Sequence, residues 1–297
     1  MKPHRTDHFP HFGGQTMISL PIQLIGLDLD GTLLGTDSCV HARERDTLQR
    51  ARQAGVSVAI TTGRSLLDAL PHAEAAGGVD WLITENGARI TSASGETIFR
   101  HPLTKRHTAQ LLQLCERHGV EPSLYGEDCV WYGAACRGFF RAVSRILGRD
   151  IPLDLRHYTF VTSRKEWHAL SGQLLYKAVV YGDTHKLDAW LSELRRTAQY
   201  EAEPSVFCGL KNIEINAAGT DKGSALLYLT KHLGLSREQV MACGDSDNDR
   251  TMLSAAGLGV AMGNAPQHIR AQADAVTESN ENHGVSRAVE RFVLQNV

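Results

Sequence analysis

Apolar positions along the chain follow two alternating patterns. Nearly continuous apolar runs, which are typical of strands covered on both faces in a parallel sheet, lie at 22–29, 56–63 and 79–88. Two segments between these runs place apolar side chains at helical spacing among charged ones, at 41–55 and 65–76, and the first ends on Gly55, a suitable C-cap. The alternation continues near the C-terminus at 224–235, 240–249 and 257–264. Together these patterns predict a doubly wound α/β core with a parallel sheet.

The pattern changes between residues 103 and 216, where most of the aromatic side chains are concentrated. Strand-like pieces such as LYKAVVYG alternate there with helix-like pieces such as KLDAWLSELRRTA. We therefore expect an inserted α+β cap domain at 103–216 and a core formed by 20–102 and 217–297. Residues 1–19 show no such pattern and are expected to be a disordered N-terminal extension.

Composition and charge narrow the functional classes. A hydrophobic share of 42% with 22% charged residues is typical of a globular protein. The formal net charge of −2 gives no electrostatic reason to expect nucleic acid or a membrane surface as a partner. No apolar run approaches the roughly 18 residues of a membrane span, and the first residues lack the apolar stretch of a signal peptide. We therefore expect a cytoplasmic monomer or homodimer with reduced cysteines.

Two carboxylates end the first apolar run. Asp28 and Asp30 are two residues apart and are followed at once by Gly31 and Thr32. Alternation along a strand would project both carboxylates the same way from the carboxyl end of the sheet, where open α/β sheets bind ligands. Acidic residues at such a position also cap turns and helices, so this pair alone indicates a site without establishing one.

Three further polar clusters end other segments of the expected core. Thr62 and Gly63 offer a hydroxyl and a free backbone N–H to a phosphate oxygen. Lys222 is expected just before or within the first turn of a helix, where both the ammonium and the helix terminus favour an anion. The segment ACGDSDNDRTML at 242–253 supplies carboxylate and amide oxygens of the kind that Mg²⁺ binds. Singly, Thr62 could be a helix cap and Lys222 a surface lysine. The shared placement of these clusters at the ends of the expected core elements favours a single site formed by all of them.

These motifs resemble, in order, the four motifs of the haloacid dehalogenase superfamily of phosphotransferases. The matching stretches are DLDGTLL, TTGR, DKG and GDSDND. The insertion between the second and third motifs, with ITENGA before it and GVAMGNA after the fourth motif, resembles the Cof-type group with a large α/β cap of type IIB. The resemblance extends from Ile22 to the C-terminus and implies a Rossmann-like core.

The resemblance also implies a role for each matched residue. Asp28 would be the nucleophile and a Mg²⁺ ligand, and Asp30 the general acid and base, with its backbone carbonyl on the metal. Asp245 would complete the protein's share of the metal shell. The positions implied to bind phosphate or substrate are Leu29, Thr62, Gly63, Lys222 and Asn248. A supporting role, on the metal or on the phosphate-binding lysine, is implied for Asp249, and a further supporting role for Arg64.

We therefore expect a Mg²⁺-dependent phosphatase that acts on small phosphomonoesters through an aspartyl-phosphate. Sugar phosphates and phosphorylated cofactors such as pyridoxal phosphate or a flavin mononucleotide are the substrates that the resemblance suggests. A phosphomutase with the same chemistry and a non-catalytic module that senses a phosphometabolite are the alternatives. Substrate choice is expected to lie in the cap, and the segment YGEDCVWYGAACR at 125–137 is the candidate contact region.

Overall fold

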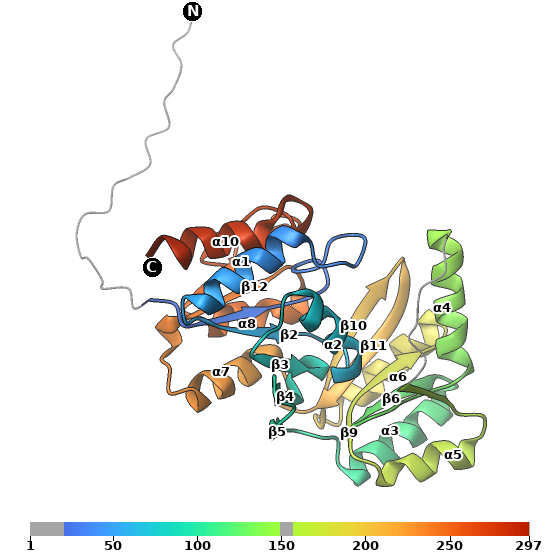
Figure 1. Cartoon of the computed structure of the whole chain (residues 1–297). Coiled ribbons are helices and arrows are strands. Elements are labelled where there is room, and N and C mark those ends of the chain that lie inside the picture. The colour runs from blue at the N-terminus through green and yellow to red at the C-terminus, as the bar shows by residue number, and fades with distance from the viewer. Residues whose placement is uncertain (1–20, 149–156, 297) are drawn as a thin grey trace, which may run out of the picture.

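The structure, a computed structural model, describes residues 21–148 and 157–296 (Figure 1). The expected N-terminal extension at 1–19 lies outside the described residues. No helix in the described part of the chain combines the length and apolar character needed to cross a membrane.

An eight-stranded sheet forms the core, in the order β14-β13-β12-β1-β2-β3-β4-β5. Its strands are β1 (Leu24–Leu27), β2 (Ser57–Thr61), β3 (Trp81–Thr84), β4 (Arg89–Ser92), β5 (Thr97–Arg100), β12 (Val240–Gly244), β13 (Leu258–Ala261) and β14 (Ala275–Val276). All neighbours from β14 to β3 run parallel, whereas β4, next to the edge strand β5, runs antiparallel to both β3 and β5. The prediction of a parallel α/β core is therefore confirmed.

Helices cover both faces of this sheet (Figure 1). The core helices are α1 (Ala42–Gln53), α2 (Leu66–Ala75), α7 (Lys222–His232), α8 (Arg250–Ala255), α9 (Gln267–Arg270) and α10 (Gly284–Phe292). Side chains alternate along β1, so that Ile25 packs with α1, α2 and α10, whereas Leu24 packs with α7, α8 and α9. Gly55 follows α1 with a φ of 86°, a backbone conformation that glycine adopts without strain.

A second, six-stranded sheet lies in the chain between β5 and α7, in the order β10-β11-β9-β6-β7-β8. Its strands are β6 (Glu121–Gly126), β7 (Val130–Tyr132), β8 (Tyr158–Phe160), β9 (Leu175–Tyr181), β10 (Tyr200–Phe207) and β11 (Leu210–Ala217). Its helices are α3 (Lys105–His118), α4 (Ala134–Leu147), α5 (Arg164–Ala169) and α6 (Thr184–Arg195). The sheet and its helices form the inserted α+β cap, and the limits 103 and 216 stay a prediction.

The two faces of the cap sheet have different surroundings. Ala178 and Val180 on β9 pack with α3, α5 and α6, while the alternate residues Val179 and Tyr181 pack with α4. Lys177 shares the second face by alternation, and it reaches a core loop. That face of the cap sheet is therefore the one that meets the core.

Short 3-10 helices complete the described structure. They are η1 (Glu85–Gly87), η3 (Leu170–Gly172), η4 (Arg237–Gln239), η5 (Asp247–Asp249), η6 (Asn280–Asn282) and η7 (Leu294–Asn296). Two of them, η1 and η5, directly follow the carboxyl ends of β3 and β12 and so lie where ligands bind in open α/β sheets.

Candidate active site

The carboxyl ends of three neighbouring strands bring the polar motifs together. Leu27, the last residue of β1, lies in register with Ile60 on β2 and with Cys243 on β12. The residues that follow these strands therefore meet at one edge of the sheet. Asp28 N–H donates to the Cys243 carbonyl at 3.1 Å, which fixes the first aspartate beside the fourth motif.

A buried lysine lies between two aspartates at this edge. Lys222 Nζ donates to Asp28 Oδ1 and to Asp249 Oδ1, each at 2.7 Å. Lys222 is 1% exposed, Asp28 4% and Asp249 0%. Although burial acts to lower it, the two carboxylates raise the pKa of Lys222 above its ordinary value. The ammonium is therefore a fixed positive charge at pH 7.

Asp249 holds this lysine and the neighbouring loop in place. Its Oδ2 accepts hydrogen bonds from the backbone N–H groups of Asp245 at 3.0 Å and Ser246 at 2.9 Å. Its Oδ1 is taken by Lys222. Because both oxygens already have partners, the geometry favours the orienting role for Asp249 over direct metal binding.

Three carboxylates, two of them buried, crowd together beside Lys222. Oxygens of Asp28, Asp245 and Asp249 all lie within 4.8 Å of one another. Burial raises the pKa of Asp28 well above its ordinary value, and burial together with the charge of Asp249 raises the pKa of Asp245 to about 6. One ammonium does not balance three carboxylates. A hard divalent cation with oxygen ligands, such as Mg²⁺, would supply the missing charge, so the donor set fits this ion.

Gly31 and Thr32 shape the space around Asp245. Gly31 has a φ of 82°, and a Cβ on it would lie 2.4 Å from Asp245 Oδ2. The Thr32 hydroxyl donates to Asp245 Oδ1 at 3.2 Å, and Asn264 Nδ2 donates to the Gly31 carbonyl at 2.8 Å. The glycine of the first motif is thus required both by its backbone conformation and by the approach of the carboxylate.

Asp30 lies in the turn after β1 and has a different environment from Asp28. It forms a bidentate ion pair with Arg64, with Nε at 2.8 Å from Oδ2 and Nη2 at 2.6 Å from Oδ1. Its side chain is 58% exposed. Although burial acts to raise it, pairing with Arg64 lowers the pKa of Asp30 below its ordinary value. We predicted that strand alternation would orient Asp30, but β1 ends at Leu27. The ion pair with Arg64 orients the Asp30 side chain instead.

The phosphate-binding candidates divide into exposed, buried and backbone groups. The Thr62 side chain is buried, and its Oγ1 accepts from the backbone N–H of Arg64 at 3.2 Å. The Leu29 side chain packs in the apolar core, so only its backbone can serve a phosphate. Asn248 is exposed and accepts from the Ser246 hydroxyl at 2.6 Å. Gly63 is close to the cap, because a Cβ on it would lie 3.4 Å from both Lys177 Nζ and Glu214 Oε2.

A network between core and cap was not predicted from the sequence. Lys177 on β9 donates to the Gly63 carbonyl at 2.8 Å and to Glu214 Oε2 on β11 at 2.7 Å. Asn86 in η1 donates to the same Glu214 oxygen at 2.8 Å and to Asn216 Oδ1 at 3.2 Å. Charged residues inside the apolar runs LYKAVVYG and KNIEINA are the signal that could have indicated these residues.

Glu85 is a second unpredicted residue at this edge. It is completely buried, and burial raises its pKa to about 7. Its Oε1 accepts from the backbone N–H of Leu66 at 3.0 Å, and its own N–H donates to the Arg64 carbonyl at 2.9 Å. Glu85 therefore holds the start of α2 and the loop with Thr62 and Arg64 against η1.

A cavity of about 600 Å³ opens beside Lys222 between core and cap. Its core wall includes Lys222, Ser246 and Asn248. The cap residues that line it come from β10 and β11, and they are Glu201, Glu203, Pro204, Ser205, Val206, Glu214 and Asn216. We expected the segment 125–137 to be the region of the cap that contacts the substrate. Because the cap lining of this cavity comes from β10 and β11, these two strands are now the candidate contact region.

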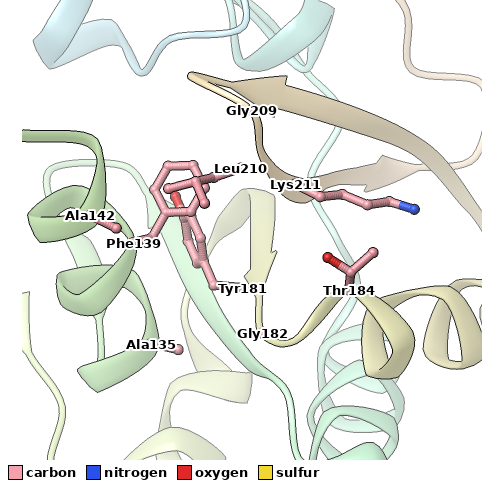
Figure 2. A pocket seen from close by; sticks show the side chains of 9 residues that line it. All are labelled: Ala135, Phe139, Ala142, Tyr181, Gly182, Thr184, Gly209, Leu210 and Lys211. Carbon is pink, nitrogen blue, oxygen red and sulfur yellow. The ribbon is translucent and has the colours of Figure 1, made fainter. Parts of the chain in front are cut away.

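A smaller cavity of about 260 Å³ lies within the cap, between α4 and the β10–β11 turn. Figure 2 shows Phe139, Tyr181 and Leu210 gathered at one side of it and Lys211 and Thr184 at the other. Its lining residues include no carboxylate or histidine. The cavity beside Lys222 is therefore the better candidate of the two for chemistry on a phosphate.

Comparison with known proteins identifies one family. The haloacid dehalogenase-like hydrolase family matches residues 25–289. The chain is 32% identical over 273 residues to the Bacillus subtilis 5-amino-6-(5-phospho-D-ribitylamino)uracil phosphatase YcsE, covering 92% of this chain and 96% of that protein. It is 32% identical over 254 residues to the HMP-PP phosphatase of Escherichia fergusonii, covering 84% of this chain and 87% of the relative.

Solved structures agree with the sequence relatives. A haloacid dehalogenase-like hydrolase from B. subtilis superposes with a TM-score of 0.79 at 27% identity, covering 92% of this chain and all of the other. The Bacteroides thetaiotaomicron phosphatase BT1666 superposes with a TM-score of 0.79 at 25% identity, covering 94% of this chain and 98% of the other. These structures therefore share both the core and the cap.

Proposed function

The chain belongs to the haloacid dehalogenase-like hydrolase family and is a phosphatase of small phosphorylated molecules, and from this premise we propose that it works in two steps through an aspartyl-phosphate on Asp28. The observation that carries the proposal is the ammonium of Lys222, buried between Asp28 and Asp249 at 2.7 Å from each and lining the large cavity. The carboxylate of Asp28, the candidate nucleophile, therefore lies directly beside a fixed positive charge.

In the first step, an oxygen of Asp28 attacks the phosphorus, and the bond from phosphorus to the leaving oxygen breaks. Asp30 donates a proton to that leaving oxygen, which requires that its ion pair with Arg64, the cause of its lowered pKa, opens when the substrate binds. In the second step, water attacks the phosphorus of the aspartyl-phosphate, Asp30 takes a proton from the water, and Asp28 is released with inorganic phosphate. Lys222, Thr62 and the backbone of Gly63 bind the phosphoryl oxygens in both steps.

Charge repulsion sets the main electrostatic requirement of this site. A carboxylate and a phosphate at 4 Å repel each other by roughly 4 kcal/mol per pair of unit charges at an effective dielectric of about 20. We infer that Mg²⁺ is held by the carboxylates of Asp28 and Asp245 and by the backbone carbonyl of Asp30. When bound, this ion would neutralise charge on the nucleophile and on the phosphoryl group.

Replacing the proposed acid and base separates the two steps. Asp30→Asn is expected to show a burst of p-nitrophenol from p-nitrophenyl phosphate followed by a steady state at least about 100-fold slower than wild type. The leaving group needs no proton, whereas the attacking water loses its base. Rapid-mixing absorbance measures both phases.

Asp46→Asn is the matched control for Asp30→Asn, because Asp46 is an exposed aspartate on α1 away from the cavity. It should behave as wild type in both phases. Equal rates in both phases for Asp30→Asn and wild type would assign Asp30 a structural role only. Formation of a phosphate isomer without phosphate release would instead favour the phosphomutase alternative.

The cap wall of the large cavity indicates the chemistry of the leaving group. Glu201 and Glu203 present carboxylates there, and Ser205 presents a hydroxyl. These groups accept or exchange hydrogen bonds with hydroxyl and amino groups and repel further anions. We therefore propose that the substrate's organic part is a neutral or cationic group rich in such donors, as in sugar phosphates and some phosphorylated cofactors.

Substitutions in this wall are expected to change selectivity and leave the phosphoryl chemistry intact. Glu203→Gln and Ser205→Ala should lower kcat/KM about 10-fold or more for polyhydroxylated or amino substrates and hardly change it for p-nitrophenyl phosphate, which lacks those donors. Steady-state kinetics over a phosphomonoester panel measures this. Asp188→Asn, an exposed cap carboxylate paired with Lys211, is the control. Uniform losses on every substrate would contradict the assignment.

A further inference from the structure

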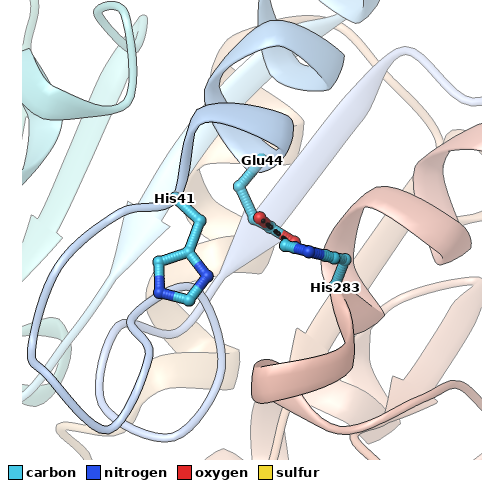
Figure 3. Close-up of side chains that lie close together, drawn as sticks. All are labelled: His41, Glu44 and His283. Atoms are coloured by element: carbon cyan, nitrogen blue, oxygen red, sulfur yellow. Dashed lines mark hydrogen bonds and ion pairs between the residues drawn. The ribbon is translucent and has the colours of Figure 1, made fainter.

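Two histidines and a glutamate meet at the start of two core helices. His41 precedes α1, Glu44 lies in its first turn, and His283 precedes α10. Figure 3 shows the three side chains converging from these two helix starts. A ring nitrogen of each histidine and a carboxylate oxygen of Glu44 lie within 4.8 Å of one another. None of the three residues belongs to the cluster around Lys222.

Glu44 is a buried carboxylate without a permanent positive partner. It is 3% exposed, and its oxygens accept from His283 Nδ1 at 2.9 Å and from the Ser286 hydroxyl at 3.3 Å. Among the described residues, no lysine or arginine forms an ion pair with it. A buried carboxylate needs positive charge nearby, and a bound cation would supply it.

The donor set matches a transition-metal site. Imidazole nitrogens and a carboxylate are ligands of Zn²⁺ at about 2.0–2.2 Å, which places tetrahedral ligand atoms roughly 3.3–3.6 Å apart. The three atoms already lie within 4.8 Å of one another, so side-chain rotations would bring them to this spacing. His41 Nε2 is also 3.6 Å from Asp37 Oδ1, which places a second carboxylate beside the ring. We propose that His41, Glu44 and His283 bind a divalent transition metal of the Zn²⁺ class.

The place of this site gives the metal a structural role. The backbone N–H of Thr36 donates to Glu281 Oε1 at 2.6 Å, and Asn280 Nδ2 donates to the Leu34 carbonyl at 2.8 Å. These bonds already join the loop that follows Asp30 to the turn before α10. A metal on His41 and His283 adds a third connection between the same two segments and fixes the loop that leaves the catalytic turn.

The test measures metal uptake by the whole chain with saturating Mg²⁺ present, so that the oxygen site near Asp28 is occupied. Because His4, His8 and His11 offer competing ligands, all three are replaced by Gln in the parent protein. Calorimetry with Zn²⁺ should show one tight equivalent, and Co²⁺ should give the intense visible absorption of a tetrahedral site. Zn²⁺ should also raise the Tm of the parent.

Ligand substitutions should remove this binding selectively. His283→Gln and His41→Gln are each expected to weaken Zn²⁺ binding at least about 100-fold and to abolish both the Co²⁺ band and the rise in Tm. The control is His118→Gln. His118 also pairs with a glutamate, Glu193, but no second histidine in the described chain completes that pair as a metal site. The variant should therefore bind Zn²⁺ as the parent does. An equal Zn²⁺ stoichiometry in the parent and His283→Gln would overturn the proposal. So would the absence of a tight Zn²⁺ equivalent in the parent, a result that does not depend on how any ligand variant folds.

Discussion

Asp28→Asn is expected to abolish phosphatase turnover, by at least about 10³-fold in kcat, while the protein stays folded. The amide keeps the shape of the side chain and its carbonyl oxygen can still accept from Lys222, but it carries no nucleophilic charge. Lys222 also retains Asp249 as an anionic partner. Phosphate release from p-nitrophenyl phosphate under Mg²⁺ measures the loss.

The stability of Asp28→Asn gives an independent check on the site. Burial raises the pKa of Asp28 well above its ordinary value, so ionised Asp28 opposes folding at pH 7. The neutral amide is therefore expected to leave Tm unchanged or to raise it. Asp80→Asn is the contrasting variant, since Asp80 precedes β3 at the opposite end of the sheet and pairs with Arg52 at 2.9 Å. It should lower Tm and spare kcat. Near-normal turnover in Asp28→Asn would falsify the nucleophile assignment.

Removal of divalent metal is the second change with a large expected effect. EDTA should abolish the activity, and Mg²⁺ should restore it, because three carboxylates beside one lysine repel a phosphate dianion unless further positive charge is present. Ca²⁺ should inhibit, since its larger and more flexible coordination shell suits an in-line displacement poorly. Activity assays after chelation and stepwise addition of each ion measure these effects.

Two variants test whether the Mg²⁺ requirement arises at the carboxylates beside Lys222. Asp245→Asn should raise the Mg²⁺ concentration needed for half-maximal activity, because a ligand is lost. His283→Gln should leave that concentration unchanged, because its proposed metal is bound elsewhere. Full activity in a chelated, metal-free sample would contradict the metal requirement. An altered Mg²⁺ requirement in His283→Gln would show that the two proposed metal sites are not independent.

The sequence determined the architecture because the responsible signals are local. The apolar runs that end in Asp28, Thr62 and the 245–249 segment are each readable within about ten residues, and parallel strands place their carboxyl ends at one edge. The family resemblance then predicted that these strand ends form a single site. Residue roles, Mg²⁺, the cytoplasmic location and the monomeric or dimeric state stay predictions.

Tertiary structure alone decided which partner each of these residues has. Arg64 rather than strand alternation directs Asp30, and Lys177 reaches the Gly63 carbonyl across 114 positions of sequence. The cap wall of the large cavity beside Lys222 comes from β10 and β11, and Glu44 meets His283 across 239 positions. Local propensity and periodicity fix which face of an element is buried, but they carry no information on which distant segment covers it. That choice follows from how the two sheets and their helices pack, and it sets the charges and distances on which the chemistry depends.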